Sequence, residues 1–182
     1  MLLPYRYVLG CEFDTALGQC VVSWSEAGVW MLELPRDWSW RPPPSGPRTD
    51  VTKLPPPEAD LPAFVAETIL KVRAHLSERV PTYGDLPLDL GNPTDFERQV
   101  LETVRRIPAG ETRTYHDVAI AIGRPNSARA VARVLAQNRL PLIIPCHRVV
   151  GSGGSLGGYS GPGGVATKTW LLEIEKPDRG ST

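Results

Sequence analysis

A cysteine, a histidine and an arginine follow one another late in the chain, at Cys146-His147-Arg148. A thiolate is a strong nucleophile, and imidazole and guanidinium groups beside it can stabilise its charge. The apolar run before this triplet ends at Pro145, which leaves the thiol at the end of a buried segment, within reach of a substrate. A lone cysteine after such a run is also often just a small buried hydrophobic residue. The triplet favours nucleophilic sulfur chemistry, and the rest of the chain has to decide between the two interpretations.

The other two cysteines, Cys11 and Cys20, do not suggest a disulfide framework or a metal site. Three cysteines are an odd number in a chain of 182 residues, which favours free thiols in a reducing compartment. Cys11 and Cys20 lie in strand-like sequence with no histidine close by, so no metal is predicted there.

The composition is that of an ordinary globular protein, with 41% hydrophobic and 22% charged residues. The chain is long enough for one large domain or two small ones. No apolar run approaches the roughly 20 residues that span a bilayer, and the first residues lack the long apolar core of a signal peptide. We therefore expect a soluble, cytoplasmic protein with no membrane partner.

Charge is unevenly distributed although the formal net charge is zero. Residues 1–93 carry 8 Lys and Arg against 12 Asp and Glu, whereas residues 94–182 carry 12 against 8. Between residues 98 and 148, nine arginines face three acidic residues. The planar guanidinium group suits phosphate oxygens and base edges, although a solvated surface with helix salt bridges fits the pattern equally well. The asymmetry thus raises a nucleic-acid hypothesis without establishing it.

The first part of the chain is typical of a small sheet covered by a helix. Alternating apolar residues predict strands over 5–9, 18–24 and 28–34, and eight prolines within 42–62 predict an exposed, extended loop. Apolar residues at helical spacing predict a helix over 59–80. His75 lies within this helix, and we expect it at the surface rather than as a ligand. Residues 84–93, rich in Gly and Pro, form a predicted linker between domains 1–83 and 94–182.

The second part is predicted to be mostly helical. Thr94 and Glu97 have the spacing of a capping box for a helix that Pro108 and Gly110 end. Thr114 is the expected cap of a helix over 115–122, and Asn126 or Ser127 caps another that runs to about residue 138. Two short helices around a turn with glycine, the second rich in Arg, have the helix-turn-helix pattern. The predicted fold class is α+β, with an antiparallel three-stranded sheet first and a helix-turn-helix domain second.

A glycine-rich segment follows the cysteine, with eight glycines among residues 151–164. It contains no Gly-x-x-x-x-Gly-Lys-Ser/Thr sequence, so a nucleotide-phosphate loop is not predicted. Its backbone can instead approach a planar ligand closely where side chains would interfere. A last helix over 165–174 should bring Lys168 and Glu175 back towards this segment.

The chain resembles the O6-alkylguanine-DNA alkyltransferases over roughly residues 94–176, and more loosely at its start, where the resemblance implies a ribonuclease H-like sheet. The resemblance is carried by Pro145-Cys146-His147-Arg148-Val149-Val150, Ser127-Ala128-Arg129-Ala130-Val131, Asn138, Gly157-Gly158-Tyr159-Ser160-Gly161 and Lys168-Thr169-Trp170-Leu171-Leu172. It implies a monomeric repair protein that moves an alkyl group from O6 of guanine in double-stranded DNA to its own Cys146, once and without a cofactor.

The resemblance also implies roles for individual residues. His147 accepts the Cys146 proton, through a water molecule, Glu175 orients His147, and Asn138 ties the arginine helix to the cysteine segment. The residues implied to hold the guanine are Tyr115, Val149, Tyr159, Ser160 and Lys168. Those implied to contact DNA are Thr114, Ser127, Ala128, Arg129 and Ala130.

The DNA residues have a physical rationale. Because a sulfur fixed in a pocket cannot reach a base inside a duplex, the nucleotide has to be turned out of the stack. Arg129 is implied to fill the vacated space, while Ala128 and Ala130 let the helix lie close to the minor groove, where recognition is largely independent of sequence. The alternative for Arg129 is a simple phosphate contact.

Two features depart from the family pattern. Pro162-Gly163 has the form of a two-residue insertion before Lys168, which leaves the shape of the pocket lid open. Zinc-binding relatives carry a cysteine and a histidine where this chain has Ser25 and Val29, so no metal is predicted.

Three other functions compete with alkyl transfer. A non-catalytic alkyltransferase-like protein would bind the same lesion without reacting, but members of that group lack the reactive cysteine. A sequence-specific regulator needs base-reading Asn or Gln on the second helix, where residues 127–136 are mainly Ala, Val and Arg. A cysteine hydrolase needs a histidine distant in sequence, and neither His75 nor His116 has a motif around it.

Overall fold

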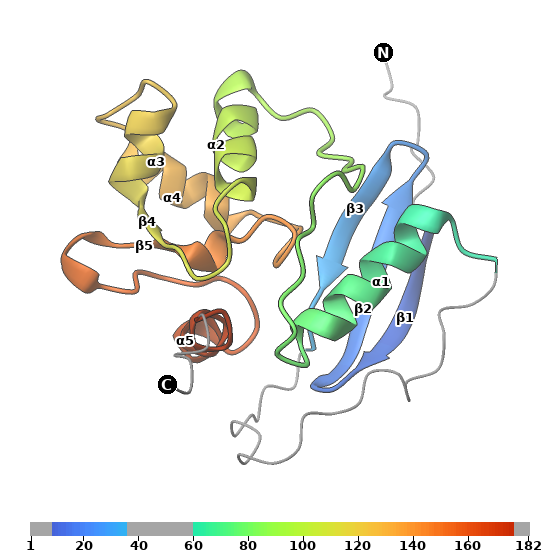
Figure 1. Ribbon diagram of the computed structural model, residues 1–182. Helices are drawn as coiled ribbons and strands as arrows, with labels where there is room; N and C mark the ends of the chain where they lie inside the picture. Colours follow the sequence, from blue (N-terminus) through green and yellow to red (C-terminus); the bar gives the residue numbers. More distant parts are fainter. Residues whose placement is uncertain (1–8, 36–59, 177–182) are drawn as a thin grey trace.

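The computed structural model describes residues 9–35 and 60–176. The first element is an antiparallel sheet of three strands in the order β1-β2-β3, formed by Leu9–Thr15, Gly18–Ser25 and Gly28–Glu33. It confirms the predicted three-stranded antiparallel sheet (Figure 1). Residues 5–8 of the expected first strand lie outside the described ranges, and β1 continues from Leu9 to Thr15. The Thr15 hydroxyl donates to Gly18 O and accepts from Leu17 N, which confines the turn to two residues.

Helix α1, Ala63–His75, packs on one face of this sheet (Figure 1). Its buried stripe of Val65, Ile69 and Val72 meets the apolar side of the strands. The helix is shorter than the predicted range 59–80. It ends early because Glu78 adopts a left-handed φ of 63° and Arg79 N donates back to Ala74 O, as in common helix C-terminal motifs. Most of the predicted proline-rich loop lies outside the described residues.

Part of the predicted linker, residues 84–93, is hydrogen-bonded to strand β3 of the three-stranded sheet. Leu88 forms a parallel bridge with Val29, Val29 N donates to Pro87 O at 2.9 Å, and Asp89 N donates to Val29 O at 2.9 Å. Gly28 permits this approach, since a Cβ atom there would lie 2.3 Å from Pro87 O. The segment therefore connects the two parts of the chain while its middle is held against β3.

The second part contains three helices near the predicted positions: α2 over Asp95–Arg105, α3 over Tyr115–Ala121 and α4 over Ala128–Ala136. Both expected threonine caps are present. Thr94 forms a capping box with Glu97, and Thr114 forms one with Asp117. Ser127 is the N-cap of α4 but makes no side-chain cap hydrogen bond. Helices α3 and α4 pack against each other and both contact α2.

The cysteine segment is not preceded by a strand, although the run before Pro145 is apolar. Residues 141–144 form turns because Leu142 has a left-handed φ of 69° and Ile144 N donates to Leu140 O at 2.8 Å. The short helix η2, Cys146–Arg148, follows directly. Strand β5, Val149–Val150, then pairs in parallel with β4, Arg113–Thr114. This two-residue ladder ties the cysteine segment to the cap of α3.

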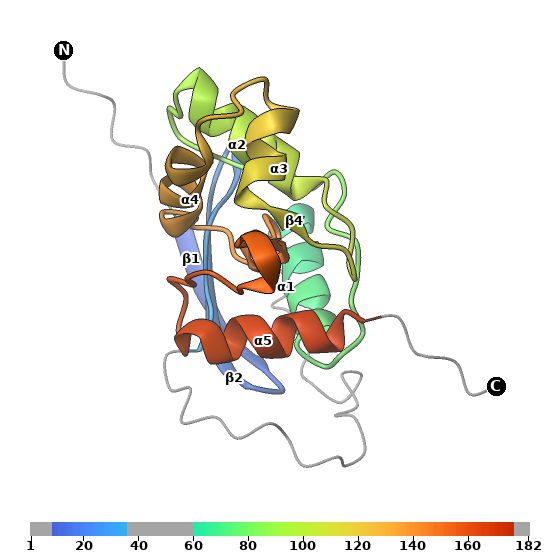
Figure 2. The ribbon, with the colours of Figure 1, turned by 90° about the vertical axis from the view of Figure 1, so that its left-hand side faces the viewer.

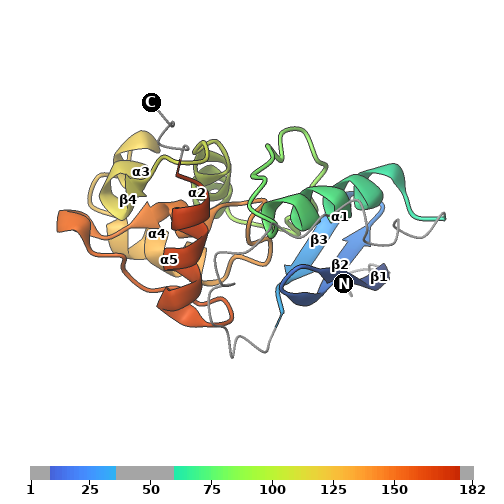
Figure 3. The same cartoon turned by 60° about the horizontal axis from the view of Figure 1, so that its bottom comes forward.

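The chain then returns through the glycine-rich segment, which includes η3 at Ser152–Gly154, to α5, Gly164–Ile174. Figure 2 shows α5 crossing below the cysteine segment. The two parts of the molecule lie side by side (Figure 3). Leu32 N of β3 donates to Arg139 O at 2.9 Å, and the Arg139 guanidinium lies 3.6 Å from the centre of the Trp30 ring. Within the described ranges, no helix is both long and apolar enough to cross a membrane.

Candidate active site

Cys146 lies at the start of η2, beside a pocket of about 380 Å³. Helices α3 and α4 form one side of the pocket and the glycine-rich segment the other. The lining residues are Tyr115, Ala132, Leu135, Ala136, Cys146, Gly158, Tyr159 and Ser160. The thiol is partly buried, so a small group has to enter the pocket to reach it. The sequence predictions for Cys146, Tyr115, Tyr159 and Ser160 thus concern residues that share one pocket.

The surroundings of Cys146 do not by themselves generate a thiolate. Burial raises the pKa of its thiol, while a hydrogen bond from Asn138, the charge of Lys168 and nearby backbone amides act in the opposite direction. Burial prevails, so the pKa of Cys146 stays above its ordinary value. Nucleophilic attack from this position needs a base that removes the proton as the reaction starts.

Asn138 connects the end of α4 to the cysteine segment. Its side-chain amide donates to Ile144 O at 2.8 Å, and its carbonyl oxygen accepts from Leu140 N at 3.0 Å. Together these bonds fix the turn before Pro145, and with it the position of Cys146.

His147 is fully buried behind the cysteine. Its Nε2 lies 2.8 Å from Glu175 Oε1, whereas its Nδ1 is buried and has no hydrogen-bond partner among the described residues. Burial lowers the pKa of His147 to about 4, although Glu175 acts to raise it. The imidazole is therefore neutral at neutral pH. With Nε2 as the donor to the carboxylate, Nδ1 carries the free lone pair.

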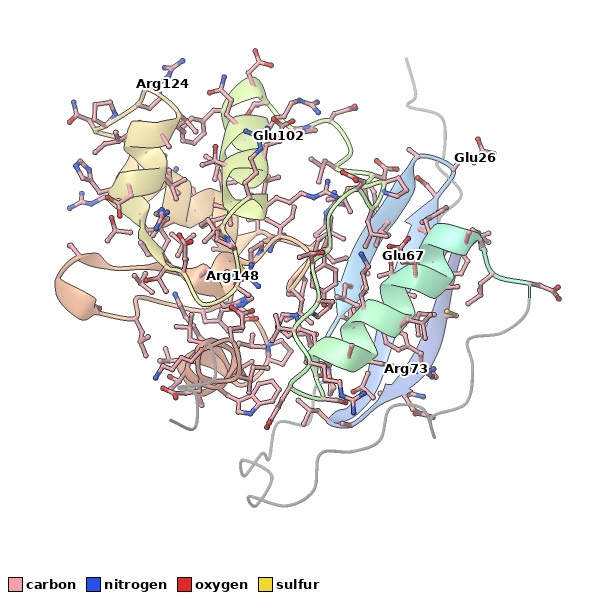
Figure 4. The ribbon with its side chains drawn as sticks, in the orientation of Figure 1. Glu26, Glu67, Arg73, Glu102, Arg124 and Arg148 are labelled. Carbon is pink, nitrogen blue, oxygen red and sulfur yellow. The ribbon has the colours of Figure 1, made fainter. Side chains whose placement is uncertain are left out.

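Glu175, just after α5, is the centre of a buried polar group that we call the Glu175 cluster: Glu175, His147, Arg148 and His75. Arg148 donates from Nε to Oε2 and from Nη2 to Oε1, both at 2.7 Å, in a two-point ion pair. Burial raises the pKa of Glu175, but contacts with His147, His75 and Arg148 outweigh it and hold the pKa well below the usual range. The carboxylate is ionised and can only accept. Figure 4 shows Arg148 near the middle of the molecule, facing the junction of its two parts.

His75 was placed wrongly by the sequence analysis. It is fully buried, and its Nε2 lies 3.1 Å from Glu175 Oε1. The surface prediction failed because α1 ends beside the last turn of α5, a contact between distant parts of the chain. One local signal existed: His75 follows Val72 by three residues, on the same stripe as Ile69 and Val65, and this stripe is buried.

His75, His147 and Glu175 have ligand atoms close enough together to hold a metal ion. Arg148 already donates to the same carboxylate oxygen, at 2.7 Å, and a cation there would repel it. The donor set therefore suits hydrogen bonding better than metal binding.

Lys168 links α5 to the other side of the pocket. Its side chain is fully buried, with Nζ donating to Val149 O at 2.7 Å and to Gly158 O at 3.3 Å. The ammonium group lies 5.9 Å from the centre of the Tyr115 ring. Burial lowers the pKa of Lys168, and Cys146 acts to raise it. Lys168 of α5 thus lies close to two other predicted site residues, Val149 of β5 and Tyr115 of α3.

The glycine-rich segment shapes the pocket entrance. A Cβ atom at Gly161 would lie 2.5 Å from the Tyr159 ring, and one at Gly157 would lie 3.1 Å from the Tyr115 ring. Ser160 is exposed at the rim. Pro162-Gly163 forms the start of α5, where Gly163 has a left-handed φ of 74° and Pro162 O accepts from the Thr167 hydroxyl. These two residues therefore lie next to the start of α5, and neither lines the pocket.

Four of the five predicted DNA residues lie together at the start of α4. We call Ser127–Ala130, at the start of α4, the α4 face. Arg129 on this face is exposed, and Ala128 and Ala130 beside it are partly exposed. Thr114 is engaged in capping α3. Figure 4 places Arg124, in the turn before this face, at the outer tip of the molecule. Helix α4 also supplies Ala132, Leu135 and Ala136 to the pocket, and Ala132 and Ala136 follow Arg129 by three and seven residues, on the same side of the helix.

Comparison with known proteins gives a consistent picture. Residues 95–177 match the family model described as the DNA-binding domain of 6-O-methylguanine DNA methyltransferase. The bifunctional transcriptional activator/DNA repair enzyme Ada of Escherichia coli is 38% identical over 175 residues, which are 95% of this chain and 46% of Ada. A probable methylated-DNA–protein-cysteine methyltransferase of Acanthamoeba polyphaga mimivirus is 47% identical over 52% of this chain and 60% of its own length. The chain thus spans about half the length of these relatives.

Other relatives are covered more fully. The methylated-DNA–protein-cysteine methyltransferase of Methanosarcina barkeri is 40% identical over 62% of this chain and 69% of its own. The crystal structure of the Mycobacterium tuberculosis O6-methylguanine methyltransferase has a TM-score of 0.70 at 30% identity, with 97% of each chain covered. The structure of the same organism's OGT in complex with DNA has a TM-score of 0.68 at 31% identity, covering 91% of this chain and 92% of that one. The chain therefore belongs to the methylated-DNA–protein-cysteine methyltransferase family.

Proposed function

We propose that this protein repairs O6-alkylguanine in double-stranded DNA by moving the alkyl group to the sulfur of Cys146, in a single turnover and without a cofactor. The observation that carries the proposal is that Cys146 borders a pocket, with the neutral, buried His147 next to it in the chain and Glu175 at Nε2 of His147. The Mycobacterium tuberculosis protein of the same fold is described as an O6-methylguanine methyltransferase, which supports the same substrate class.

In the proposed reaction His147 acts as the base. Nδ1 takes the proton of Cys146, through a water molecule because neighbouring residues seldom face one another, and Glu175 stabilises the imidazolium that forms. The thiolate then attacks the alkyl carbon. A sulfur–carbon bond forms, the bond from that carbon to O6 breaks, and guanine leaves with the electron pair. The thioether is stable, so Cys146 is not regenerated.

Residues around the pocket are proposed to recognise the guanine. Lys168 and the hydroxyls of Tyr115 and Ser160 stabilise the departing base by donating hydrogen bonds, and Tyr159 packs against it. The carbonyl of Val149 accepts from the exocyclic amine. That carbonyl already accepts from Lys168, but a carbonyl oxygen has two lone pairs and can accept again. The carbonyl of Cys146 takes the same role.

The DNA is proposed to bind on the α4 face. We interpret α3 and α4 as a helix-turn-helix whose second helix enters the minor groove, with Arg129 filling the space of the flipped nucleotide and Ser127, Ala128, Ala130 and Thr114 along the backbone. Support comes from the exposure of Arg129 and from the DNA complex of the similar Mycobacterium tuberculosis structure. Because α4 also lines the pocket, a base turned out beside Arg129 has a short path to Cys146.

The domain division and the setting are part of the same proposal. We assign residues 1–83 to a ribonuclease H-like domain, 84–93 to the connection and 94–182 to the DNA-binding and alkyl-acceptor domain. The protein is proposed to act as a monomer in the cytoplasm. A non-catalytic alkyltransferase-like role is not favoured, because the acceptor cysteine is present at the pocket.

Mass spectrometry after incubation with duplex DNA that contains O6-methylguanine tests the proposal. We expect the intact mass to rise by one methyl group, located on the peptide that carries Cys146, with no further gain on longer incubation. Cys146→Ser should remain unmodified, with Cys11 and Cys20 as internal controls within the same chain. Unmodified wild-type protein that still binds the lesion would contradict the proposal and leave the lesion-binding role.

A further inference from the structure

The alkyl-acceptor site contains a histidine that the proposed mechanism does not use. His75 is the last residue of α1 and is fully buried. Its Nε2 lies 3.1 Å from Glu175 Oε1, the oxygen that His147 Nε2 approaches at 2.8 Å, but unlike the His147 contact it lacks the alignment of a hydrogen bond. The two imidazole rings are 6.2 Å apart between centres and meet edge to face, at 74°. One carboxylate oxygen thus faces imidazoles from both parts of the molecule.

The hydrogen positions in this group follow from the charges. Glu175 is ionised and can only accept, so contact with His75 is favourable when Nε2 of His75 carries the hydrogen. Nδ1 of His75 is then the acceptor, and it lies 3.1 Å from the hydroxyl of Tyr83. Burial raises the pKa of Tyr83 well above its ordinary value, which keeps that hydroxyl protonated and able to donate. Tyr83 therefore selects the tautomer of His75 that carries its hydrogen on Nε2, the nitrogen 3.1 Å from Glu175 Oε1.

We propose that His75 is a positioning residue for alkyl transfer, which holds Oε1 of Glu175 jointly with His147 and so lets the sheet domain set the orientation of the proton acceptor. This inference rests on the proposed function. It assigns a task in the chemistry to α1, which contributes no residue to the Cys146 pocket.

The shared carboxylate of Glu175 also affects the pKa of His147, the proposed base. The groups that face the cluster are His75 from α1, Tyr83 from the following segment, His147 and Arg148 from η2, and Glu175 after α5; Cys20 of β2 acts on Tyr83. His75 and Arg148 both lower the pKa of His147, against the effect of Glu175. Without His75, the negative charge of Oε1 acts on His147 with less competition. His147 should then be protonated at a higher pH and stop serving as a base there.

The experiment compares two replacements of His75 with a control. His75→Gln keeps an N–H donor for Glu175, whereas His75→Phe has a ring of similar size and no donor. Ile69→Ala, on the buried stripe of α1, removes apolar packing away from the cluster and should lower Tm without changing chemistry. The rate of Cys146 alkylation is measured with O6-methylguanine DNA and with free O6-benzylguanine from pH 5 to pH 9, beside Tm.

We expect His75→Phe to react about 10-fold more slowly at neutral pH. This loss is smaller than the ~10²-fold or more expected when a general base itself is removed. The acidic limb of its pH–rate profile should move to higher pH. His75→Gln should stay within about 3-fold of wild type. His75→Phe should also be the less stable of the two, because it leaves the buried hydroxyl of Tyr83 without its acceptor. Ile69→Ala separates positioning from a purely structural role, because it should lower Tm without slowing alkylation or moving the pH–rate profile.

Two results would overturn the inference while the proposed function stands. One is a His75→Phe variant with the wild-type rate and pH profile. The other is a rise in the Tm of the wild-type protein on addition of zinc chloride that is absent in His75→Gln. Such a rise would show that His75, His147 and Glu175 bind a metal ion. Failure of the wild-type protein itself to gain an alkyl group on Cys146 would instead contradict the proposed function.

Discussion

The Glu175 cluster and the α4 face use charge in opposite ways. In the cluster, Glu175 and Arg148 are buried, paired at two points and fixed by contacts from several elements. On the α4 face, Arg129 is exposed and lies next to small residues. A buried charge is costly to leave unpaired, whereas an exposed charge is screened by water and contributes little to stability. The cluster should therefore couple chemistry to folding, and the α4 face should serve DNA binding with almost no effect on folding.

The largest effect should come from Glu175→Gln. This change leaves the buried Arg148 without its carboxylate and His147 without the group that stabilises its protonated form. Breaking a buried ion pair costs about 3–5 kcal/mol. We expect a loss of this size in the free energy of unfolding, measured by urea denaturation, and an alkylation rate at least about 100-fold lower. A variant as stable as wild type would show that the cluster does not couple folding to chemistry.

Low pH should also destabilise the folded protein through the Glu175 cluster. His147 has its pKa lowered to about 4 in the folded protein, so between the unfolded value of 6.5 and about 4 the unfolded chain binds a proton that the folded protein does not. Stability therefore falls as pH falls through this window, by about 3 kcal/mol for one such group. Urea denaturation at a series of pH values measures it. His147→Phe should flatten the curve over the same range, and an unchanged slope would locate the acid sensitivity elsewhere.

Arg129→Ala should separate the two regions. We expect repair of O6-methylguanine in duplex DNA to slow by about 10-fold to 100-fold, because turning out a base costs a few kcal/mol that Arg129 helps to offset. Reaction with free O6-benzylguanine should be unchanged, and the free energy of unfolding should stay within about 0.5 kcal/mol. Arg133→Ala, on the exposed side of the same helix, is the matched control for general loss of positive charge. Equal losses with both substrates would argue against base flipping by Arg129.

The smallest effect should come from Thr114→Ala. Thr114 caps α3 through its hydroxyl and pairs with β5, and loss of an N-cap costs about 1 kcal/mol. Thermal denaturation measures this loss, with Thr94→Ala at the cap of α2 as the comparison. A similar fall in both variants would assign Thr114 to folding. A further loss of DNA affinity in Thr114→Ala alone would support its proposed contact with DNA.

Local chemistry predicted much of this molecule. The capping boxes at Thr94 and Thr114 depend on residues three apart, so they were visible in the sequence and are present in the structure. The positions of α2, α3 and α4 were predicted closely for the same reason, whereas α1, predicted over 59–80, spans only Ala63–His75. The turns before Cys146 were missed, because a run of apolar residues looks like a strand and only the left-handed backbone of Leu142 makes it turn.

The sequence by itself determined the reactive triplet, the family pattern around it and the separation of an acidic first part from a basic second part, because these depend on residue type and short-range order. Only the tertiary structure decided that His75 shares the carboxylate of Glu175 with His147. That contact joins α1 to the end of α5, and its formation depends on how two segments far apart in the sequence pack. A histidine on a helix stripe carries no sign of which distant carboxylate it will meet.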